Sequence, residues 1–340
     1  MAGITGEIDQ YGFERPDDFD YDSYEAFMSA YLRVLARRAA KWEKLLGTKL
    51  SNLTHSRKVK RYVRKGVPSE SRGEVWLIIS RAKAKLDAAP LKYEELVQGN
   101  MDEKIVDIIE RDIRRTYPEN VYFRDVKDSQ LTSLKNVLVA VAHYKESIGY
   151  CQGLNYIVGM LLLITKDEKM SFWLIVEILE RLVPDFYSKN LVGVRVETLV
   201  LMELISQRHP DLYLHFKSNG IDLNLTTSKW FICLFMDVLP VETTLRIWDC
   251  LFYEGSKILL RVALTLIISN KEKFLASKDF TEICQTFKKI TNNSLTLDCH
   301  SFLQNCFKVP GSLPMAKIQE LRIRHQEELA IEEQKLRSSK

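Results

Sequence analysis

The chain has 340 residues, of which 46% are hydrophobic and 28% are charged, a composition typical of soluble globular proteins with one large domain or two modest ones. Its 49 basic and 45 acidic residues nearly balance, which argues against a nucleic-acid-binding protein. The six cysteines occur without a C-x-x-C pair, which excludes a disulfide scaffold and indicates reduced thiols of a cytosolic protein.

The N-terminal region, residues 1–65, is predicted to be an extension with one helix and a basic cluster. Its first residues lack the basic and apolar stretches of a secretory signal, so we expect none. Apolar residues at helical spacing predict a helix over residues 21–46. The basic cluster follows at Arg57, Lys58, Lys60, Arg61, Arg64 and Lys65. It favours either the solvated face of a helix or a patch for anionic lipid or an acidic partner.

From residue 66 onward the pattern predicts one helix after another. A turn at residues 66–71 leads into a helix that carries Val75 and Trp76. Further helices are predicted over residues 102–115, 131–143, 155–164, 170–183, 194–208, 227–238, 243–253, 257–269, 279–290 and 299–307. No strand alternation with hairpin dipeptides interrupts them, so the predicted fold is all-α with short connections.

The packed region is expected to end at the Pro-Gly-Ser-Leu-Pro break at residues 310–314. Residues 315–340 are charged and helix-prone but sustain no heptad seam. They predict a mostly solvated tail helix. No apolar run approaches the roughly 20 residues that a helix needs to span a bilayer, so no transmembrane segment is expected.

An arginine motif closes the predicted helix at residues 102–115. Ile109, Asp112 and Arg115 fall on one helical face, so an acid one turn earlier can hold the guanidinium of Arg115. An arginine can neutralise the charge that develops on a transferring phosphoryl group. A purely structural alternative is also open, because cations near a helix C-terminus complement the helix dipole.

A glutamine motif follows at residues 149–155 (Gly-Tyr-Cys-Gln-Gly-Leu-Asn). Its glycines let the backbone approach a partner closely, and the Gln152 amide can both accept from and donate to one water molecule. The structural alternative is a tight turn in which Gln152 caps a helix. A thiol hydrolase built on Cys151 and His143 is disfavoured, because nothing in the sequence activates the thiol.

The chain has no phosphate-binding motif of its own. It contains neither G-x-x-x-x-G-K-S/T nor G-x-G-x-x-G, so any phosphates must come with a partner. We expect no cofactor and no metal site. Two further segments, residues 72–76 and 245–255, place a tryptophan beside charged residues and are interpreted as architecture. Their charged and aromatic members are Arg72, Trp76, Arg246 and Asp249.

Taken in order, these motifs resemble the TBC (Tre-2/Bub2/Cdc16) domain of GTPase-activating proteins for Rab-type small GTPases. The resemblance covers residues 66–268 and rests on the segments at residues 66–76, 109–118, 150–155, 230–231, 239–240 and 246–255. The segments at residues 11–16, 60–68, 230–235 and 310–313 make the whole chain similar to short members of the family. Two departures are mild: Leu154 stands where methionine is common, and Ser80 where glycine is.

The resemblance implies two helical subdomains that meet at a groove, with Arg115 and Gln152 presented into it. Asp112 would hold Arg115 in place. The other roles that it implies are a glutamine loop shaped by Tyr150, Gly153 and Asn155, and subdomains kept in register by Arg72, Trp76 and Asp249. The implied domains are residues 66–256 for the TBC domain, 257–314 for helices packed on it and 315–340 for the tail.

The implied activity is to stimulate GTP hydrolysis by a Rab-family GTPase, which would bring GTP and Mg²⁺. The chain would supply an arginine and a glutamine in trans, without being an enzyme itself, in the regulation of vesicle trafficking. The expected location is the cytoplasm, and association with the membrane that carries the partner stays open. A helical adaptor that binds a GTPase without catalysis is the competing hypothesis. The sequence does not indicate which Rab is the partner.

Overall fold

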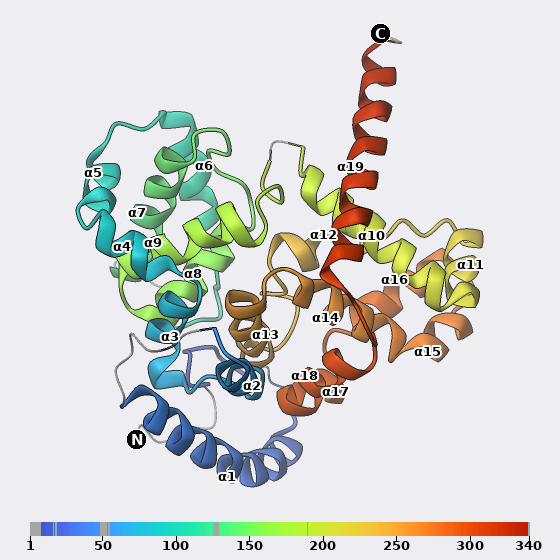
Figure 1. Cartoon of the computed structure of the whole chain (residues 1–340), viewed down its shortest axis with the longest axis horizontal. Coiled ribbons are helices and arrows are strands. Elements are labelled where there is room, and N and C mark those ends of the chain that lie inside the picture. Colours follow the sequence, from blue (N-terminus) through green and yellow to red (C-terminus); the bar gives the residue numbers. More distant parts are fainter. Residues whose placement is uncertain are drawn as a thin grey trace. The chain divides into compact units, whose positions relative to one another are not determined.

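The computed structural model describes residues 8–15, 17, 19–47, 53, 55–124, 129–188 and 190–338. Within these ranges the regular elements are helices, apart from two isolated antiparallel bridges, Ile8 with Glu14 and Phe13 with Asn120. The predicted all-α fold is confirmed, and Figure 1 shows the succession of helices. Residues 1–7, where a secretory signal would begin, and Pro16 of the motif at residues 11–16 lie outside the described part.

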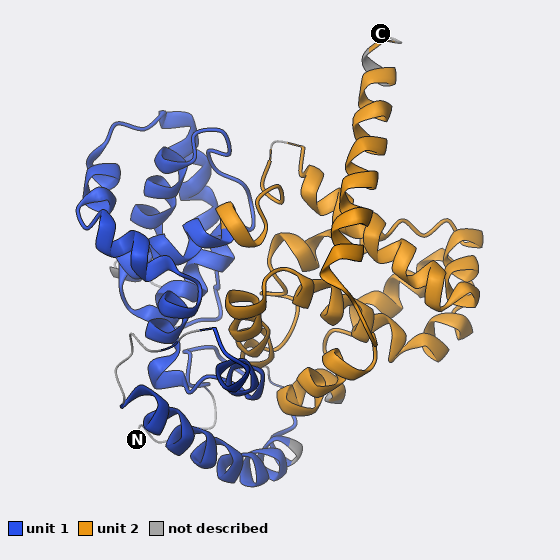
Figure 2. Ribbon diagram, in the orientation of Figure 1, with its two compact units in different colours: residues 1–178 blue, residues 179–340 orange. Residues whose placement is uncertain are grey.

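The chain divides into two compact units, Met1–Ile178 (unit 1) and Leu179–Lys340 (unit 2), coloured separately in Figure 2. Two helical units agree with the prediction of two helical subdomains. The predicted domain boundaries after residues 65, 256 and 314 differ from this division. They stay predictions, as does the groove between the subdomains. None of the described helices combines the length and apolarity needed to cross a bilayer.

Unit 1 is organised around one apolar helix. Its elements are α1 (Tyr21–Leu46), α2 (Arg57–Lys65), η2 (Ser69–Ser71), α3 (Arg72–Ile79), α4 (Ala82–Ala88), α5 (Lys92–Gln98), α6 (Glu103–Ile113), α7 (Ser129–Tyr144), α8 (Leu154–Thr165) and α9 (Glu168–Glu177). Helix α8 is apolar on nearly every side and packs against α3, α6, α7 and α9. Because such a helix is stable only when it is enclosed, α8 forms the centre of unit 1 and fixes the loop that precedes it.

Unit 2 follows the same principle with a central pair of helices. Its elements are the π-helix η3 (Ile178–Leu182), which begins at the boundary, α10 (Val192–Arg208), α11 (Pro210–Ser218), α12 (Leu223–Ile232), α13 (Val241–Glu254), α14 (Lys257–Ile268), α15 (Lys271–Ala276), α16 (Phe280–Lys289), α17 (Ser294–Leu297), α18 (Cys299–Lys308) and α19 (Met315–Ser338). Helices α13 and α14 pack against each other and against α18, and most of their side chains are buried. They form the core of the unit.

The helix predicted over residues 227–238 ends early, at Ile232. Leu234, Phe235 and Asp237 adopt left-handed backbone conformations, with φ of 48°, 65° and 58°. Leu234 and Phe235 are fully buried, and the carbonyl of Leu234 accepts a hydrogen bond of 2.9 Å from the Trp248 indole. Burial of these two side chains offsets the backbone strain, which is on the order of 1–3 kcal/mol per residue. The prediction was wrong beyond Ile232 because helical spacing cannot reveal such a compensation.

The tail helix is not solvated on every side. Most residues of α19 are exposed, but Ile318, Leu321 and Leu329 are buried, and the helix packs against α10. Figure 1 shows its last turns extending beyond the other helices of unit 2. Most of the helix is thus exposed to solvent, and its face toward α10 is buried.

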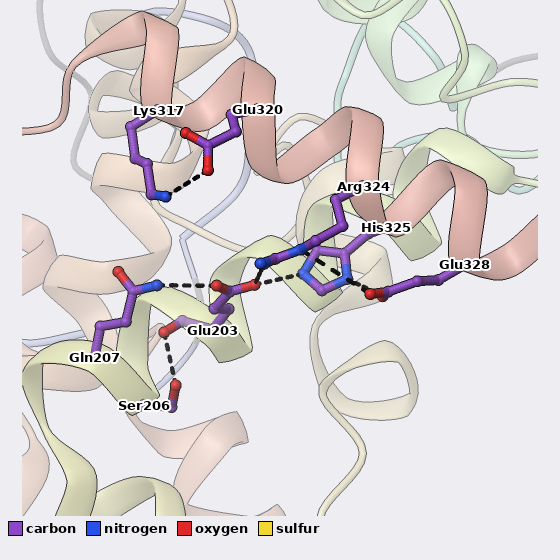
Figure 3. Close-up of polar contacts among 8 residues, drawn as sticks. All are labelled: Glu203, Ser206, Gln207, Lys317, Glu320, Arg324, His325 and Glu328. Atoms are coloured by element: carbon purple, nitrogen blue, oxygen red, sulfur yellow. Dashed lines mark hydrogen bonds and ion pairs between the residues drawn. The ribbon is translucent and has the colours of Figure 1, made fainter.

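Ion pairs accompany this packing of α19. Arg322 donates to both carboxylate oxygens of Glu197 on α10, at 2.8 and 2.6 Å, and the Glu197 side chain is 1% exposed. Six residues further along α10, Glu203 accepts from Arg324 and His325 (Figure 3). Although burial opposes it, these hydrogen bonds lower the pKa of Glu203. The last long helix is therefore an integral part of unit 2.

Candidate functional site

Arg115 lies just beyond the C-terminus of α6. The helix begins at its N-cap Asp102, whose side chain accepts from the Lys104 amide, and it ends at Ile113. The Arg115 Nε and Nη2 atoms donate to Oδ1 of Asp112, at 2.9 and 2.7 Å. The Asp112 side chain is 9% exposed and that of Arg115 54%. In the structure, the carboxylate of an acid one turn earlier thus binds this arginine.

This pairing leaves part of the guanidinium available. The hydrogen bond from Arg115 to Asp112, together with the opposite charge, raises the pKa of Arg115, which keeps the side chain ionised. Its Nη1 atom makes no hydrogen bond to any residue in the described part of the chain. A guanidinium has five N–H donors in a fixed plane, so one edge stays free for an external anion.

The glutamine loop joins α7 to α8. Gly149 and Gly153 adopt φ of 61° and 107°, conformations that favour glycine and that turn the chain sharply on both sides of Gln152. The Gln152 side chain is exposed, and its carboxamide group forms no hydrogen bond within the ranges that the structure describes. The alternative in which Gln152 caps α8 is not observed, since Gly153 is the N-cap and has no side-chain cap.

Two chains of hydrogen bonds connect the arginine and glutamine loops. In the first, the Tyr150 hydroxyl donates to Oδ2 of Asp112 at 2.7 Å, so that Asp112 serves Arg115 with one oxygen and Tyr150 with the other. Burial, followed by the hydrogen bond to Asp112, raises the pKa of Tyr150, which keeps its hydroxyl a donor. The backbone next to Gln152 is thereby tied to the residue that holds Arg115.

The second connection runs through Thr116. Its hydroxyl donates to the Asp112 carbonyl at 2.7 Å and accepts from Nδ2 of Asn155 at 2.8 Å. Oδ1 of Asn155 in turn accepts from the Gly153 amide at 3.0 Å. Thr116 and Asn155 are buried, and the polar groups of both side chains find hydrogen-bond partners in this network. The sequence singled out Asn155, but it gave no special role to Thr116.

Tyr117 seats the arginine loop on α8. Its backbone is left-handed, with φ of 52°, and its hydroxyl donates to the Tyr156 carbonyl at 2.6 Å. A Cβ atom added to Gly159 of α8 would lie 3.1 Å from the Tyr117 ring. The ring therefore packs directly against this glycine, and a larger residue there would have to displace the ring. Sequence reasoning missed Tyr117, although an aromatic residue directly after a threonine at a predicted helix end was a usable signal.

The Cys151 thiol lies in the same loop but is not activated. Burial, helped by the negative charge of Asp112, raises the pKa of Cys151 to about 11. His143 cannot serve as its base, because its ring nitrogens contact the carbonyls of Leu96 and Asn100 at 2.7 and 2.8 Å. A protonated thiol without a base is a poor nucleophile, so the geometry disfavours a thiol hydrolase.

The remaining motif residues lie apart from this network. In unit 1, Trp76 is fully buried and Arg72, which is 1% exposed, donates to the Tyr11 hydroxyl at 2.8 Å. In unit 2, Arg246 and Asp249 are both buried on α13, with Nε and Oδ2 3.7 Å apart. All four residues are buried within their own units, and the predicted role of Arg72, Trp76 and Asp249 in keeping the subdomains in register stays a prediction. Among the described residues, no group of three or more His, Cys, Asp or Glu side chains is arranged to hold a metal ion.

The chain is similar to known proteins over most of its length. Residues 69–275 match the model of the family described as Rab-GTPase-TBC domain. Growth hormone-regulated TBC protein 1 of Homo sapiens is 48% identical over 316 residues, covering 93% of this chain and 94% of that protein. Growth hormone-regulated TBC protein 1-A of Danio rerio is 46% identical over 319 residues, covering 94% of this chain and 89% of that protein.

A solved structure shows the same fold. The Chlamydomonas flagellar RabGAP TBC domain aligns with a TM-score of 0.77 at 28% sequence identity, covering 88% of this chain and 99% of that chain. The family match includes both the arginine loop and the glutamine loop.

Proposed function

Because this chain belongs to the Rab-GTPase-TBC domain family, we propose that it is a GTPase-activating protein for a Rab-type small GTPase. The observation that carries the proposal is the hydrogen-bonded network of unit 1. It holds an exposed arginine and an exposed glutamine on two adjoining loops. The partner would bring GTP and Mg²⁺, and the chain would act only by the side chains that it supplies.

Arg115 would stabilise the transition state of hydrolysis. Charge spreads over the oxygens of the γ-phosphoryl group as it is transferred, and an ionised guanidinium neutralises that charge. Asp112 binds Nε and Nη2, so Nη1 and the outer edge of the side chain would meet the phosphate. Asp112 thus acts as a positioning residue that aims Arg115 before the partner arrives.

Gln152 would orient the attacking water molecule. Its carboxamide can accept one hydrogen bond from the water and donate another to a phosphate oxygen. The left-handed turns at Gly149 and Gly153 present the side chain outward, and Tyr150 fixes the loop from below. In this arrangement Gln152 positions the water molecule, while Arg115 neutralises the charge on the phosphate.

The test is a phosphate-release screen over a panel of GTP-loaded Rabs. The wild type is expected to accelerate hydrolysis by at least one of them. Since an arginine supplied in trans contributes roughly 10³ to 10⁵ in rate, Arg115→Ala should abolish the stimulation. Gln152→Ala should also lose it, while both variants still bind the GTP-loaded partner. Full activity of Arg115→Ala would contradict the mechanism. Binding by the wild type with unaltered hydrolysis rates across the panel would favour the adaptor hypothesis.

We also propose that the chain acts in the cytoplasm on membranes that carry its partner, as a regulator of vesicle trafficking. Helix α2 supports association with an anionic surface. It buries Val59 and Val63 and exposes basic residues, of which Arg57, Lys58, Arg61 and Lys65 are the most accessible.

Vesicle sedimentation tests this association. Binding of the wild type to phosphatidylserine-containing vesicles should fall when Arg57, Lys58 and Arg61 are changed to glutamine. The control changes two exposed cations of α16, Lys288 and Lys289, in the same way. Equal sedimentation of the α2 variant and the wild type would leave α2 as a solvated helix face.

A further inference from the structure

The N-terminal segment, residues 8–15, forms a tight turn that is stabilised by its own residues. The Asp9 carboxylate accepts from the amides of Tyr11 and Phe13, at 2.8 and 2.9 Å. The Asp9 amide donates to the Phe13 carbonyl at 2.8 Å, and Ile8 bridges to Glu14. A segment folded in this way can make side-chain and backbone contacts as a unit.

This turn is bound to residues 119–124, which follow the arginine loop in the chain. The Glu14 amide donates to the Glu119 carbonyl and the Val121 amide donates to the Gly12 carbonyl, each at 2.9 Å. Asn120 is fully buried, and its Nδ2 donates to the Tyr11 carbonyl at 2.9 Å. These bonds satisfy backbone groups on both segments, so the two hold each other in register.

The contact is close enough to require a glycine. Gly12 has φ of 90°, and a Cβ atom at this position would lie 2.6 Å from the Tyr122 ring. On the other side, the Tyr11 hydroxyl accepts from the buried Arg72 of α3 at 2.8 Å. The turn is therefore fixed between α3 and residues 119–124 rather than lying loosely on the surface.

From this turn, one aromatic contact reaches the arginine loop. The Phe13 ring meets the Tyr117 ring edge to face, with centroids 5.1 Å apart and an interplanar angle of 88°. Tyr117 is two residues from Arg115, and its hydroxyl and ring are seated on α8, the helix that begins at the glutamine loop. Tyr117 therefore lies between the N-terminal turn on one side and α8 on the other.

We propose that residues 8–15 are a positioning element for Arg115, acting through Tyr117. This inference rests on the proposed function. It assigns a role to a segment outside residues 69–275, the part that matches the family model. The Phe13 ring and the backbone bonds to residues 119–121 keep Tyr117 against α8, and Tyr117 fixes the direction in which the chain leaves α6. Because the placement of a donated group matters on the scale of 1 Å, loosening this support lowers the rate of the chemical step.

The main test uses the full chain with a GTP-loaded Rab that the screen has identified as a partner. Phe13→Ala removes the edge-to-face contact and is expected to lower kcat of stimulated hydrolysis roughly tenfold to a hundredfold, with KM for the GTPase unchanged. Phe13→Tyr, which keeps the ring, should retain most of the rate. The matched control is Phe27→Ala, which removes a stacked pair with Tyr31 inside α1, in the same N-terminal region.

A second measurement does not depend on activity. Amide hydrogen exchange of residues 115–124 should be faster in Phe13→Ala than in the wild type and unchanged in Phe27→Ala. Unchanged kcat and unchanged exchange in Phe13→Ala would overturn the inference, as would a rise in KM with kcat preserved, which would indicate a docking role. If the wild type stimulates no Rab, the proposed function fails. The exchange experiment still tests whether residues 8–15 hold the arginine loop in place.

Discussion

At the scale of single residues, the two carboxylate oxygens of Asp112 bind different partners. Oδ1 accepts hydrogen bonds from Arg115, and Oδ2 accepts one from the Tyr150 hydroxyl. We predict that Tyr150→Phe lowers kcat of stimulated hydrolysis about tenfold, because a hydrogen bond to a charged group contributes roughly 1.5–3 kcal/mol. The control is Tyr187→Phe, which removes a hydroxyl that donates to the Ile232 carbonyl in unit 2 at 2.8 Å. Both variants should lose some thermal stability, and a rate as low in Tyr187→Phe would refute a specific role for Tyr150.

Cys151 gives a pH-dependent prediction. Since its pKa is raised to about 11, the reactive thiolate forms only as the pH rises toward that value. At pH 8 its alkylation by iodoacetamide should be on the order of a hundredfold slower than that of free cysteine. Mass spectrometry of the peptide that contains Cys151 measures this rate. Cys151→Ser should retain stimulated hydrolysis, whereas rapid alkylation at neutral pH would revive the thiol hypothesis.

At the scale of elements, the attachment of α19 depends on a buried ion pair. Arg322→Ala would leave Glu197, which is 1% exposed, without this bidentate partner. Removing one member of a buried pair costs about 3–5 kcal/mol, so we predict a clear fall in thermal stability and faster amide exchange in α19. Lys317→Ala is the matched control on the same helix. Its pair with Glu320, drawn in Figure 3, is exposed to solvent, and its loss should cost less than about 1 kcal/mol. Equal effects of the two substitutions would contradict the prediction.

Helix positions could be predicted from the sequence where a pattern was long. Helix α1 begins and ends at the predicted residues, 21 and 46, and α6, α7 and α8 lie within two residues of their predicted limits. The short helices α4, α5, α11, α15 and α17 were not predicted, because so few turns give only a weak periodic pattern. Helix α3, with eight residues, was predicted from the turn at residues 66–71 that precedes it. The early end of α12 depends on burial that only the folded unit supplies.

At the scale of the whole molecule, the arginine loop and the glutamine loop are expected to act together in catalysis. Arg115→Ala and Gln152→Ala should each remove most of the stimulation, and the double variant should be little slower than either single one. Residues that act as a unit are strongly non-additive in their kinetic effects. Single-turnover hydrolysis with saturating activator measures all three variants. Effects that multiply would show that the two side chains contribute independently, despite the hydrogen bonds between their loops.

The candidate site was predictable where it followed from motifs and not where it follows from long-range contacts. Asp112, Tyr150 and Asn155 stand in the motifs that pointed to them, and the structure joins them. Nothing near residues 8–15 indicates that they pair with residues 119–121, more than 100 residues away. The same holds for Arg322 and Glu197, which are 125 residues apart. Local spacing carries no information on such partners, since tertiary packing decides them.

The lack of space between Gly12 and Tyr122 has a consequence for the history of the sequence. A side chain at residue 12 would meet the Tyr122 ring, and the positive φ there would strain any residue other than glycine, whatever stands at residue 122. Residue 122 can become smaller without a clash as long as Gly12 is kept. In an alignment of descendants of the same ancestral gene, residue 12 should therefore stay glycine while residue 122 varies in size.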